Sequence, residues 1–182
     1  MPADFLLRAT QAGDIAAITA IYAEAVRHGT ASYELEPPDH AEMTRRWRDL
    51  AAKDYPHLVA VGGGGVVGYA YAGPYRPRPA YRYSVEDSIY VAPAAQGRGV
   101  GRALLAELIG LCEVRGFRQL IAVIGGGTEH AASVGLHAVL GFRQIGVIEG
   151  SGFKHGRWLD TVLMQRALGR GNTAPPEDAI SR

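Results

Sequence analysis

A run of glycines and arginines at residues 96–102, QGRGVGR, is the stretch of this sequence whose residue types and spacing point most directly to ligand binding. Glycines allow an anion to approach the backbone closely, and Arg98 and Arg102 add positive charge. The dinucleotide fingerprint does not apply, because the spacing is G-x-G-x-G and no acidic residue lies near position 120. The P-loop string does not occur in the sequence either. The run therefore predicts a phosphate-binding loop that is neither a dinucleotide fingerprint nor a P-loop.

The segments on either side place this run between a strand and a helix. Residues 81–91, YRYSVEDSIYV, are predicted to form a strand, and residues from Gly99 to about Gly116 a helix with one apolar face. Side chains alternate along a strand, so Glu86 is expected on one face and Asp87 on the other. A helix N-terminus offers unpaired N–H groups and the positive end of the helix dipole, which both favour a bound anion.

The rest of the chain alternates between strand and helix patterns. Apolar spacing predicts further helices over 15–28, 37–50 and 129–142, with Asp14 and Gly29 at the ends of the first. Further strands are predicted at 5–10, 57–61, 66–73, 119–125, 143–150 and 154–168. Four glycines at 62–65 lie between two of these strands, which favours a hairpin turn over a second phosphate site. This order predicts an α/β (mixed α+β) fold, a single domain whose central twisted mixed sheet is flanked by helices.

Size and composition narrow the function classes. The 182 residues favour one domain over residues 1–168, followed by a tail at 169–182 that lacks apolar periodicity and is expected to be disordered. A net charge of +1 gives no indication of nucleic-acid or membrane binding, and we expect neither a signal peptide nor a membrane span. The single cysteine, Cys112, can form neither an internal disulfide nor a usual metal site, which favours a cytoplasmic protein without a metal.

The segment SIYVAPAAQGRGVGRALLAELI resembles the acetyl-CoA-binding motif of the GNAT N-acetyltransferase superfamily, a strand followed by Q/R-x-x-G-x-G/A and a helix. GLHAVLGF is similar to the second conserved helix of that superfamily, and the resemblance extends over about residues 5–168. Four further blocks resemble the phosphinothricin and methionine sulfone or sulfoximine acetyltransferase branch: TASYELEPP, AGPYRPRPAYRYSVEDSIYV, ASVGLHAVLGF and GSGFKHGRWLD.

The resemblance implies direct acetyl transfer from acetyl-CoA, as co-substrate, to the α-amino group of a small amino acid or analogue, with both substrates bound and no acyl-enzyme. It implies a homodimer as well. In the branch an asparagine stands where this chain has His130, so His130 or Ser133 would have to replace its contact with the co-substrate. The pyrophosphate would lie on the glycine loop and the pantetheine arm along the strand, which assigns binding to Ile89, Tyr90, Val91, Gln96, Gly97, Arg98, Gly99, Val100, Gly101 and Arg102.

The same resemblance assigns the general base, which must take a proton from the substrate ammonium, to Glu86. A carboxylate is costly to bury in a sheet, and burial would raise its pKa toward a useful value. The alternative is a structural carboxylate paired with an arginine such as Arg82. For Asp87, on the opposite face, we expect structural hydrogen bonds.

Two histidines are further candidates for proton transfer. His137 stands where many superfamily members have a tyrosine that protonates the leaving thiolate. It could donate that proton or only pack, in which case solvent would serve. His155, in KHGRW, matches a histidine that the branch uses for substrate binding or proton transfer, and a structural role in a closing strand is the alternative.

The substrate side of the site is expected in two loops. Arg76 and Arg78, in a loop stiffened by prolines, offer forked donors for a substrate carboxylate, unless the loop is only a solvated surface. Tyr33 and Glu34 match the substrate-facing loop of the branch, although Tyr33 could be a packing wall.

Two other functions stay open at this point. One is acetylation of a different amine, such as a polyamine, an aminoglycoside or a protein N-terminus, although the arginine loop argues against a polyamine. The other is a non-catalytic acetyl-CoA-binding module, against which the intact Glu86 and glycine loop argue.

Overall fold

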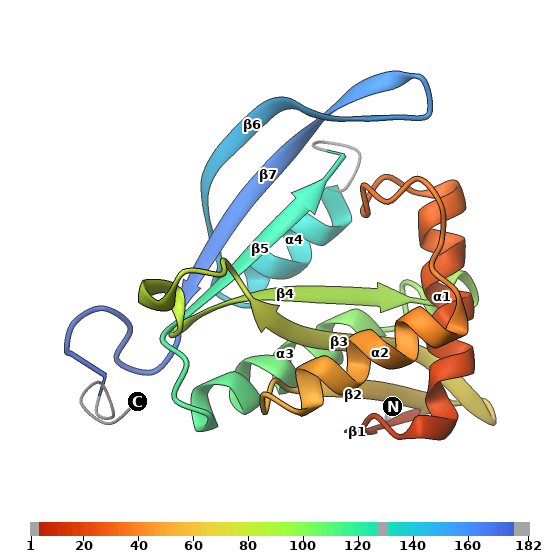
Figure 1. Ribbon diagram of the computed structural model, residues 1–182, viewed down its shortest axis with the longest axis horizontal. Coiled ribbons are helices and arrows are strands. Elements are labelled where there is room, and N and C mark those ends of the chain that lie inside the picture. The colour runs from red at the N-terminus through yellow and green to blue at the C-terminus, as the bar shows by residue number, and fades with distance from the viewer. Residues whose placement is uncertain (1–3, 127–130, 177–182) are drawn as a thin grey trace.

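The computed structural model describes residues 4–126 and 131–176. Its centre is a seven-stranded sheet in the order β1-β2-β3-β4-β5-β7-β6, which confirms the predicted fold class and the predicted order of elements (Figure 1). The strands are β1 Phe5–Ala9, β2 His57–Gly62, β3 Gly65–Pro74, β4 Ser84–Val91, β5 Gln119–Gly125, β6 Arg143–Lys154 and β7 Arg157–Ala167. The helices are α1 Ile15–His28, α2 His40–Ala51, α3 Val100–Val114 and α4 Ala131–Val139, and short 3-10 turns lie at Ala12–Asp14, Pro79–Tyr81 and Pro93–Ala95.

One face of the sheet is covered by α3 and is built from small residues. Ala60, Ala70 and Ala72 of β2 and β3 are completely buried there, so the helix can approach the sheet closely. From α3, Leu104 and Leu108 are completely buried in the same cluster. This packing fixes the helix so that its N-terminus follows the end of β4 after a short turn.

The opposite face is covered by α1 and α2 and is aromatic. Ile15, Ile18 and Met43 from the two helices are buried against Val59 and Tyr69 of the sheet. Tyr69 stacks between its neighbours His57 and Tyr90, with ring centroids 5.8 and 5.3 Å away. The two faces therefore differ in kind, with aliphatic packing under α3 and stacked rings under α1 and α2.

The sheet divides between β4 and β5, the one pair of neighbours that runs parallel among the described strands. They pair only from Ser84 to Asp87 on β4 and from Gln119 to Ala122 on β5. Beyond this point β4 continues to Val91 alongside β3, and β5 continues to Gly125 alongside β7. The two strands diverge, and an opening forms inside the sheet.

Several predicted boundaries need correction. Residues 81–83 precede β4 instead of belonging to it, because the chain makes a 3-10 turn at Pro79–Tyr81. Asp14 does not cap α1: its carboxylate accepts two hydrogen bonds from Arg8 and one from the Gln11 N–H. The predicted hairpin turn is confirmed, since Gly63 and Gly64 have φ angles of +59° and +87°.

The closing hairpin turns later than predicted. Its reversal lies at His155 and Gly156, whose φ angles of +51° and +76° supply the change of direction. Lys154 therefore ends β6 and His155 lies in the turn, not in a strand as the sequence pattern indicated.

The chain after β7 folds back on the domain. Leu168 is completely buried, and the Arg118 guanidinium donates to the carbonyls of Gly171 and Ala174. None of the described helices has the length and apolar character that crossing a membrane requires.

A buried ion pair joins β4 to α4. His137 Nε2 lies 3.0 Å from Asp87 Oδ2, and His137 Nδ1 lies 2.7 Å from the Ser133 carbonyl oxygen. Both ring nitrogens thus face an acceptor, which favours the doubly protonated imidazolium. Burial alone would lower the pKa of His137, but the hydrogen bonds with Asp87 and Ser133 raise it above its ordinary value.

Replacing His137 with alanine would leave the Asp87 carboxylate buried without its partner. We expect the free energy of unfolding, measured by chemical denaturation at pH 6, to fall by about 3–5 kcal/mol. Adding Asp87→Asn should recover part of the loss, and a double variant as unstable as His137→Ala would contradict the pairing. The interactions that raise the pKa of His137 stabilise the wild type fully below pH 6.5. This contribution is lost as the pH rises through the pKa of His137 in the folded protein.

Candidate active site

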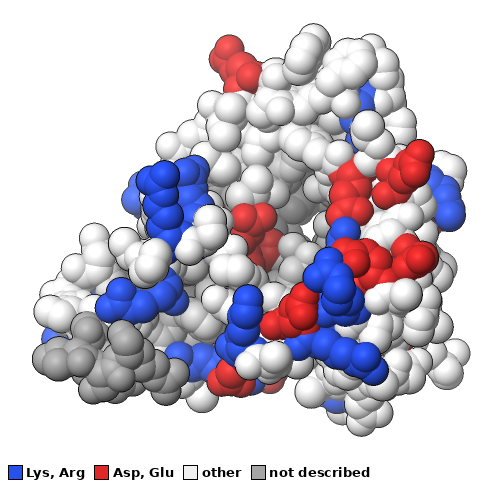
Figure 2. Space-filling model, in the orientation of Figure 1, with Lys and Arg blue, Asp and Glu red and all other residues white. Residues whose placement is uncertain are grey.

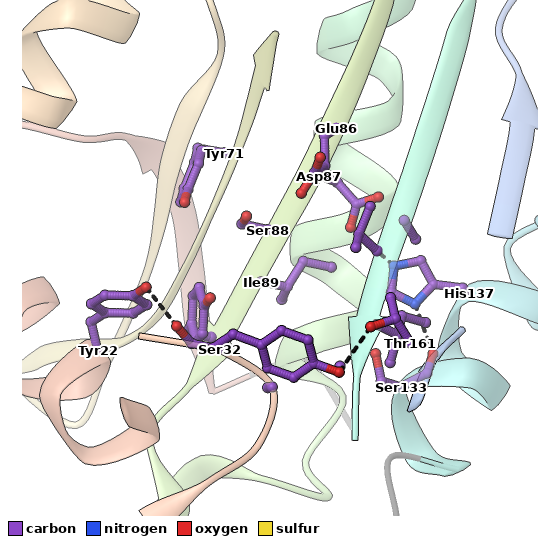
Figure 3. A pocket seen from close by; sticks show the side chains of 17 residues that line it. Tyr22, Ser32, Tyr71, Glu86, Asp87, Ser88, Ile89, Ser133, His137 and Thr161 are labelled. Atoms are coloured by element: carbon purple, nitrogen blue, oxygen red, sulfur yellow. Dashed lines mark hydrogen bonds and ion pairs between the residues drawn. The ribbon is translucent and has the colours of Figure 1, made fainter. Parts of the chain in front are cut away.

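A cavity of about 300 Å³ occupies the opening between β4 and β5, and we call it the central cavity. Figure 2 shows the corresponding face of the molecule hollowed at its centre, with acidic atoms at the floor. Glu86 and Asp87 are the acidic residues that line the cavity. Its other polar lining includes Tyr22, Ser32, Tyr71, Ser88, Ser133 and Thr161 (Figure 3).

Glu86 lies on β4 at the point where β4 and β5 separate, on the face that α1 and α2 cover. Burial, and secondarily the neighbouring charge of Asp87, raises the pKa of the Glu86 carboxyl to about 7. None of the ion pairs found in the described part of the chain involves Glu86, so the structural alternative of a pair with Arg82 is not formed: Arg82 lies over the Tyr83 ring. A carboxylate that changes charge near neutral pH and is not tied to a cation can accept and release a proton.

Asp87 points away from Glu86's face and toward His137 (Figure 3). Its Oδ2 accepts from the imidazole, whereas its Oδ1 is buried with no hydrogen-bond partner among the described residues. His137 lines the central cavity but has both nitrogens engaged. The pair therefore holds α4 and Ser133 against the cavity wall.

The glycine loop has the geometry of an anion site. Gly97 and Gly99 adopt φ angles of +71° and +83°, and a Cβ added at either would meet no atom within 4 Å, so their backbone is open to a ligand. The Gln96 N–H donates to the Pro93 carbonyl oxygen. Ala103 is the next residue whose backbone N–H has a hydrogen-bond partner in the described chain. The backbone N–H groups in between are free for a phosphate at the N-terminus of α3.

The other residues of the glycine loop either hold the loop in place or are exposed beside it. The Gln96 side chain donates to the Val91 carbonyl oxygen at 3.2 Å, so it holds the loop onto the end of β4. A Cβ at Gly101 would lie 3.4 Å from Leu136, which places α3 close to α4. Arg98 and Arg102 are exposed, and Val100 is buried beneath the loop.

Of the strand residues predicted to contact the co-substrate, Ile89 and Tyr90 line the central cavity, whereas Val91 packs against the α3 core. Ser133 lines the cavity from α4. His130 lies outside the described residues.

Tyr33 closes one end of the central cavity. Its hydroxyl bonds to the Asp160 carbonyl oxygen at 3.0 Å and to Thr161 Oγ1 at 2.8 Å, which links the α1–α2 loop to β7. Its ring lies where a Cβ at Gly125 or Gly152 would come within 2.8 or 2.6 Å of it. Glycine at both positions is what allows the ring to span from the loop to the far strands.

The same loop is held at two more points. The buried Lys154 ammonium donates to the Ser32 carbonyl oxygen at 2.7 Å, and His155 Nε2 lies 3.3 Å from the Gly29 carbonyl oxygen. Glu34 pairs with Arg46 of α2 at 2.6 Å. Neither His155 nor Glu34 is among the residues that line the central cavity.

The predicted arginine pair does not line the central cavity either. Arg76 and Arg78 are exposed on the loop that joins β3 to β4, and the Arg76 guanidinium lies over the rings of Tyr75 and Tyr81. The sequence analysis assigned no role to four polar residues that line the cavity: Tyr22, Tyr71, Ser88 and Thr161. For Tyr71, Ser88 and Thr161 the available signal is alternation along their strands, and for Tyr22 it is its place on the apolar face of α1.

Comparisons with known proteins agree with this geometry. The model of the Acetyltransferase (GNAT) family matches residues 18–142. A phosphinothricin N-acetyltransferase of Alcaligenes faecalis is 54% identical over 171 residues, which cover 94% of this chain and 86% of that protein. An L-methionine sulfoximine/L-methionine sulfone acetyltransferase of Salmonella typhimurium is 40% identical over 162 residues, covering 89% and 94%.

The solved structures include a GNAT superfamily phosphinothricin acetyltransferase from Sinorhizobium meliloti in complex with AcCoA. It is 50% identical to this chain, and the TM-score of the superposition is 0.94. The match covers 98% of this chain and 96% of the solved chain. The divided sheet, the open glycine loop and these similarities lead to one conclusion: the chain belongs to the GNAT family of acetyltransferases.

Proposed function

We propose that this protein transfers the acetyl group of acetyl-CoA directly to the α-amino group of a small amino acid or analogue, of the phosphinothricin, methionine sulfone or methionine sulfoximine type. The observation that carries the proposal is the half-buried Glu86 carboxyl, with a pKa of about 7, at the point where β4 and β5 diverge. The similarity to acetyltransferases named for these substrates supports the same acceptor class.

The residues present fit acetyl-CoA. The free N–H groups that follow Gln96, with the left-handed Gly97 and Gly99, would hold the pyrophosphate, while Arg98 and Arg102 add charge. Ile89 and Tyr90 would lie beside the pantetheine arm in the opening between the strands. When bound, acetyl-CoA supplies an electrophilic thioester carbonyl to the central cavity.

Glu86 acts as the general base in this proposal. It takes a proton from the substrate ammonium, so that the nitrogen lone pair can form the new C–N bond while the C–S bond breaks. His137 acts as a positioning residue, because Asp87 and the Ser133 carbonyl oxygen occupy both of its nitrogens. We therefore assign protonation of the leaving thiolate to solvent, and a holding role for the α1–α2 loop to Tyr33, Glu34 and His155.

Arg76 and Arg78 would bind the substrate carboxylate at the mouth of the site. Their loop begins directly after Pro74, and in the β3–β4 pair Gly73 stands opposite Glu86. Two forked donors on the loop that follows the strand beside Glu86 suit an α-amino acid, whose carboxylate and amine are close together.

Thiol release from acetyl-CoA with a panel of amines tests the acceptor class. We expect turnover with phosphinothricin, methionine sulfone and methionine sulfoximine, and little with spermidine, an aminoglycoside or a short peptide. Adding 3-(methylsulfonyl)propylamine, which is methionine sulfone without its carboxylate, tests the arginine loop. Turnover confined to a non-amino-acid amine would overturn the substrate assignment, and equal turnover of the decarboxylated analogue would remove the carboxylate clamp.

The Glu86 assignment predicts a pH dependence. Because the base must be ionised, kcat/KM should rise with pH through an apparent pKa near 7. Glu86→Gln should lower kcat at neutral pH by about 10²-fold or more and remove this rise, with acetyl-CoA affinity unchanged by calorimetry. Glu107→Gln, on the exposed side of α3, is the matched control. Wild-type turnover in Glu86→Gln would assign the base elsewhere.

We also propose that the protein is a cytoplasmic homodimer. The edge strand β6 and the start of β7 expose apolar side chains, namely Ile145, Val147, Ile148 and Phe153 on β6 and Trp158 on β7. Phe153 and Trp158 lie opposite each other across the β6–β7 hairpin, and an exposed apolar patch on an edge strand favours association with a second copy.

The proposed cytoplasmic location is supported by the lone cysteine, which is buried in the α3 core and fits a reducing compartment. Cell fractionation would check this location.

Light scattering after gel filtration measures the oligomeric state. We expect a dimer for the wild type and a monomer for Trp158→Glu, because a charge would be placed in the apolar patch. Val114→Glu introduces the same charge at an exposed position of α3 and should leave the dimer intact. A monomeric wild type would rule the homodimer out.

A further inference from the structure

A second cavity, of about 390 Å³, lies between α2 and the aromatic face of the sheet, and we call it the α2 cavity. Its walls are largely apolar, with Ile15, Ile18, Met43, Trp47 and Leu50 contributed by α1 and α2. Three charged residues also line it, namely Arg46 and Asp49 of α2 and Lys53 just beyond the end of that helix. An apolar cavity of this volume with a few polar groups is the usual form of a small-molecule pocket.

The α2 cavity meets the central cavity at the proposed base. Glu86, Ser88, Tyr22 and Tyr71 line both cavities. A group bound in the α2 cavity is therefore on one side of Glu86, and the opening between β4 and β5 is on the other. An acceptor held with its amine at Glu86 can place the rest of its chain in the α2 cavity.

Gly73 keeps the passage beside Glu86 open. It stands directly opposite Glu86 in the antiparallel β3–β4 pair, where facing Cβ atoms are about 4.5–5.5 Å apart. Gly73 also lines the α2 cavity, and a Cβ there would lie 3.5 Å from Leu50, an ordinary contact. Neither its backbone angles nor steric crowding requires glycine at this position, so the space that it leaves is available to a ligand.

Tyr69 supplies the unpaired polar group of the α2 cavity. It is fully buried and lines the cavity, and its hydroxyl has no hydrogen-bond partner among the described residues. Burial raises the pKa of Tyr69 well above its ordinary value, so the group remains a neutral phenol that can donate. A buried donor without a partner is uncommon because it loses its hydrogen bond to water, and a ligand acceptor would restore the bond.

We propose that the α2 cavity binds the side chain of the amino-acid acceptor, with the Tyr69 hydroxyl donating to an oxygen at the tip of that side chain and Gly73 setting the width of the entrance. The inference rests on the proposed function and deepens it. The chemical class is an unbranched α-amino acid whose side chain ends in a hydrogen-bond acceptor, such as a sulfone, sulfoximine or phosphinate oxygen. A largely apolar wall that also carries the unpaired Tyr69 hydroxyl suits a methylene chain with such a tip.

Methionine sulfone and methionine form a matched substrate pair, because they differ only in two oxygens on the sulfur. In Tyr69→Phe, which removes one hydroxyl, the ratio of kcat/KM for the sulfone over methionine should fall about threefold to tenfold. Tyr55→Phe, a partly buried tyrosine stacked on Phe117 and outside both cavities, is the control that should keep the wild-type ratio. An unchanged ratio in Tyr69→Phe would overturn the hydroxyl assignment.

Gly73→Val tests the entrance with a residue that suits a strand. We expect kcat/KM for methionine sulfone to fall about tenfold or more, and that for alanine to fall less, since only the longer side chain must pass position 73. Equal losses for both substrates would show that the change acts on the base, which overturns the size role. Thermal unfolding and acetyl-CoA calorimetry establish that each variant is folded.

The two levels of the proposal fail in different ways. A wild-type enzyme that acetylates no amino acid overturns the proposed function, and the subsite with it. A wild type that acetylates amino acids, with both variants retaining its selectivity, leaves the function standing and removes the subsite alone.

Discussion

β4 separates from β5 after a short parallel pairing, and the architecture of the active site follows from this divergence. Two parallel strands that pair over only four residues each leave backbone and side chains open in the middle of a sheet. The packing of α3 on the alanine face fixes β4 and the start of the helix together, and the pairing of β5 with β7 holds the other wall. The central cavity is what remains between them.

Adjacent residues of β4 take opposite roles because a strand alternates its faces. Glu86 turns to the aromatic face, where burial without a cation raises its pKa to about 7. Asp87 turns to the α4 face, where His137 neutralises it in a buried pair. The same chemical group thus becomes a proton acceptor at one position and a structural anion at the next, and the difference lies in the partner that the fold supplies.

Long-range contacts complete the cavity. The α1–α2 loop crosses to the β6–β7 hairpin through Tyr33, Lys154 and His155, and two glycines on different strands make room for the Tyr33 ring. On the other side, α2 stands far enough from the sheet to leave the α2 cavity, which reaches the same carboxylate. Two ligands could therefore approach Glu86 from different directions, as a reaction between a thioester and an amine requires.

The order of elements, the hairpin at Gly63 and Gly64 and the glycine loop at the start of α3 could all be predicted from the sequence. They depend on neighbours in the chain, through periodicity, turn geometry and the N–H groups of a helix end. The alternation along β4 also separated Glu86 from Asp87. Which residues contact Glu86 and Asp87 became visible in the folded structure alone. The His137–Asp87 pair, the Tyr33 bridge and the position of His155 in a turn join segments that are far apart in the chain, and no local pattern encodes such contacts. Proton affinity follows burial and partners, so it too is set by packing and not by residue type.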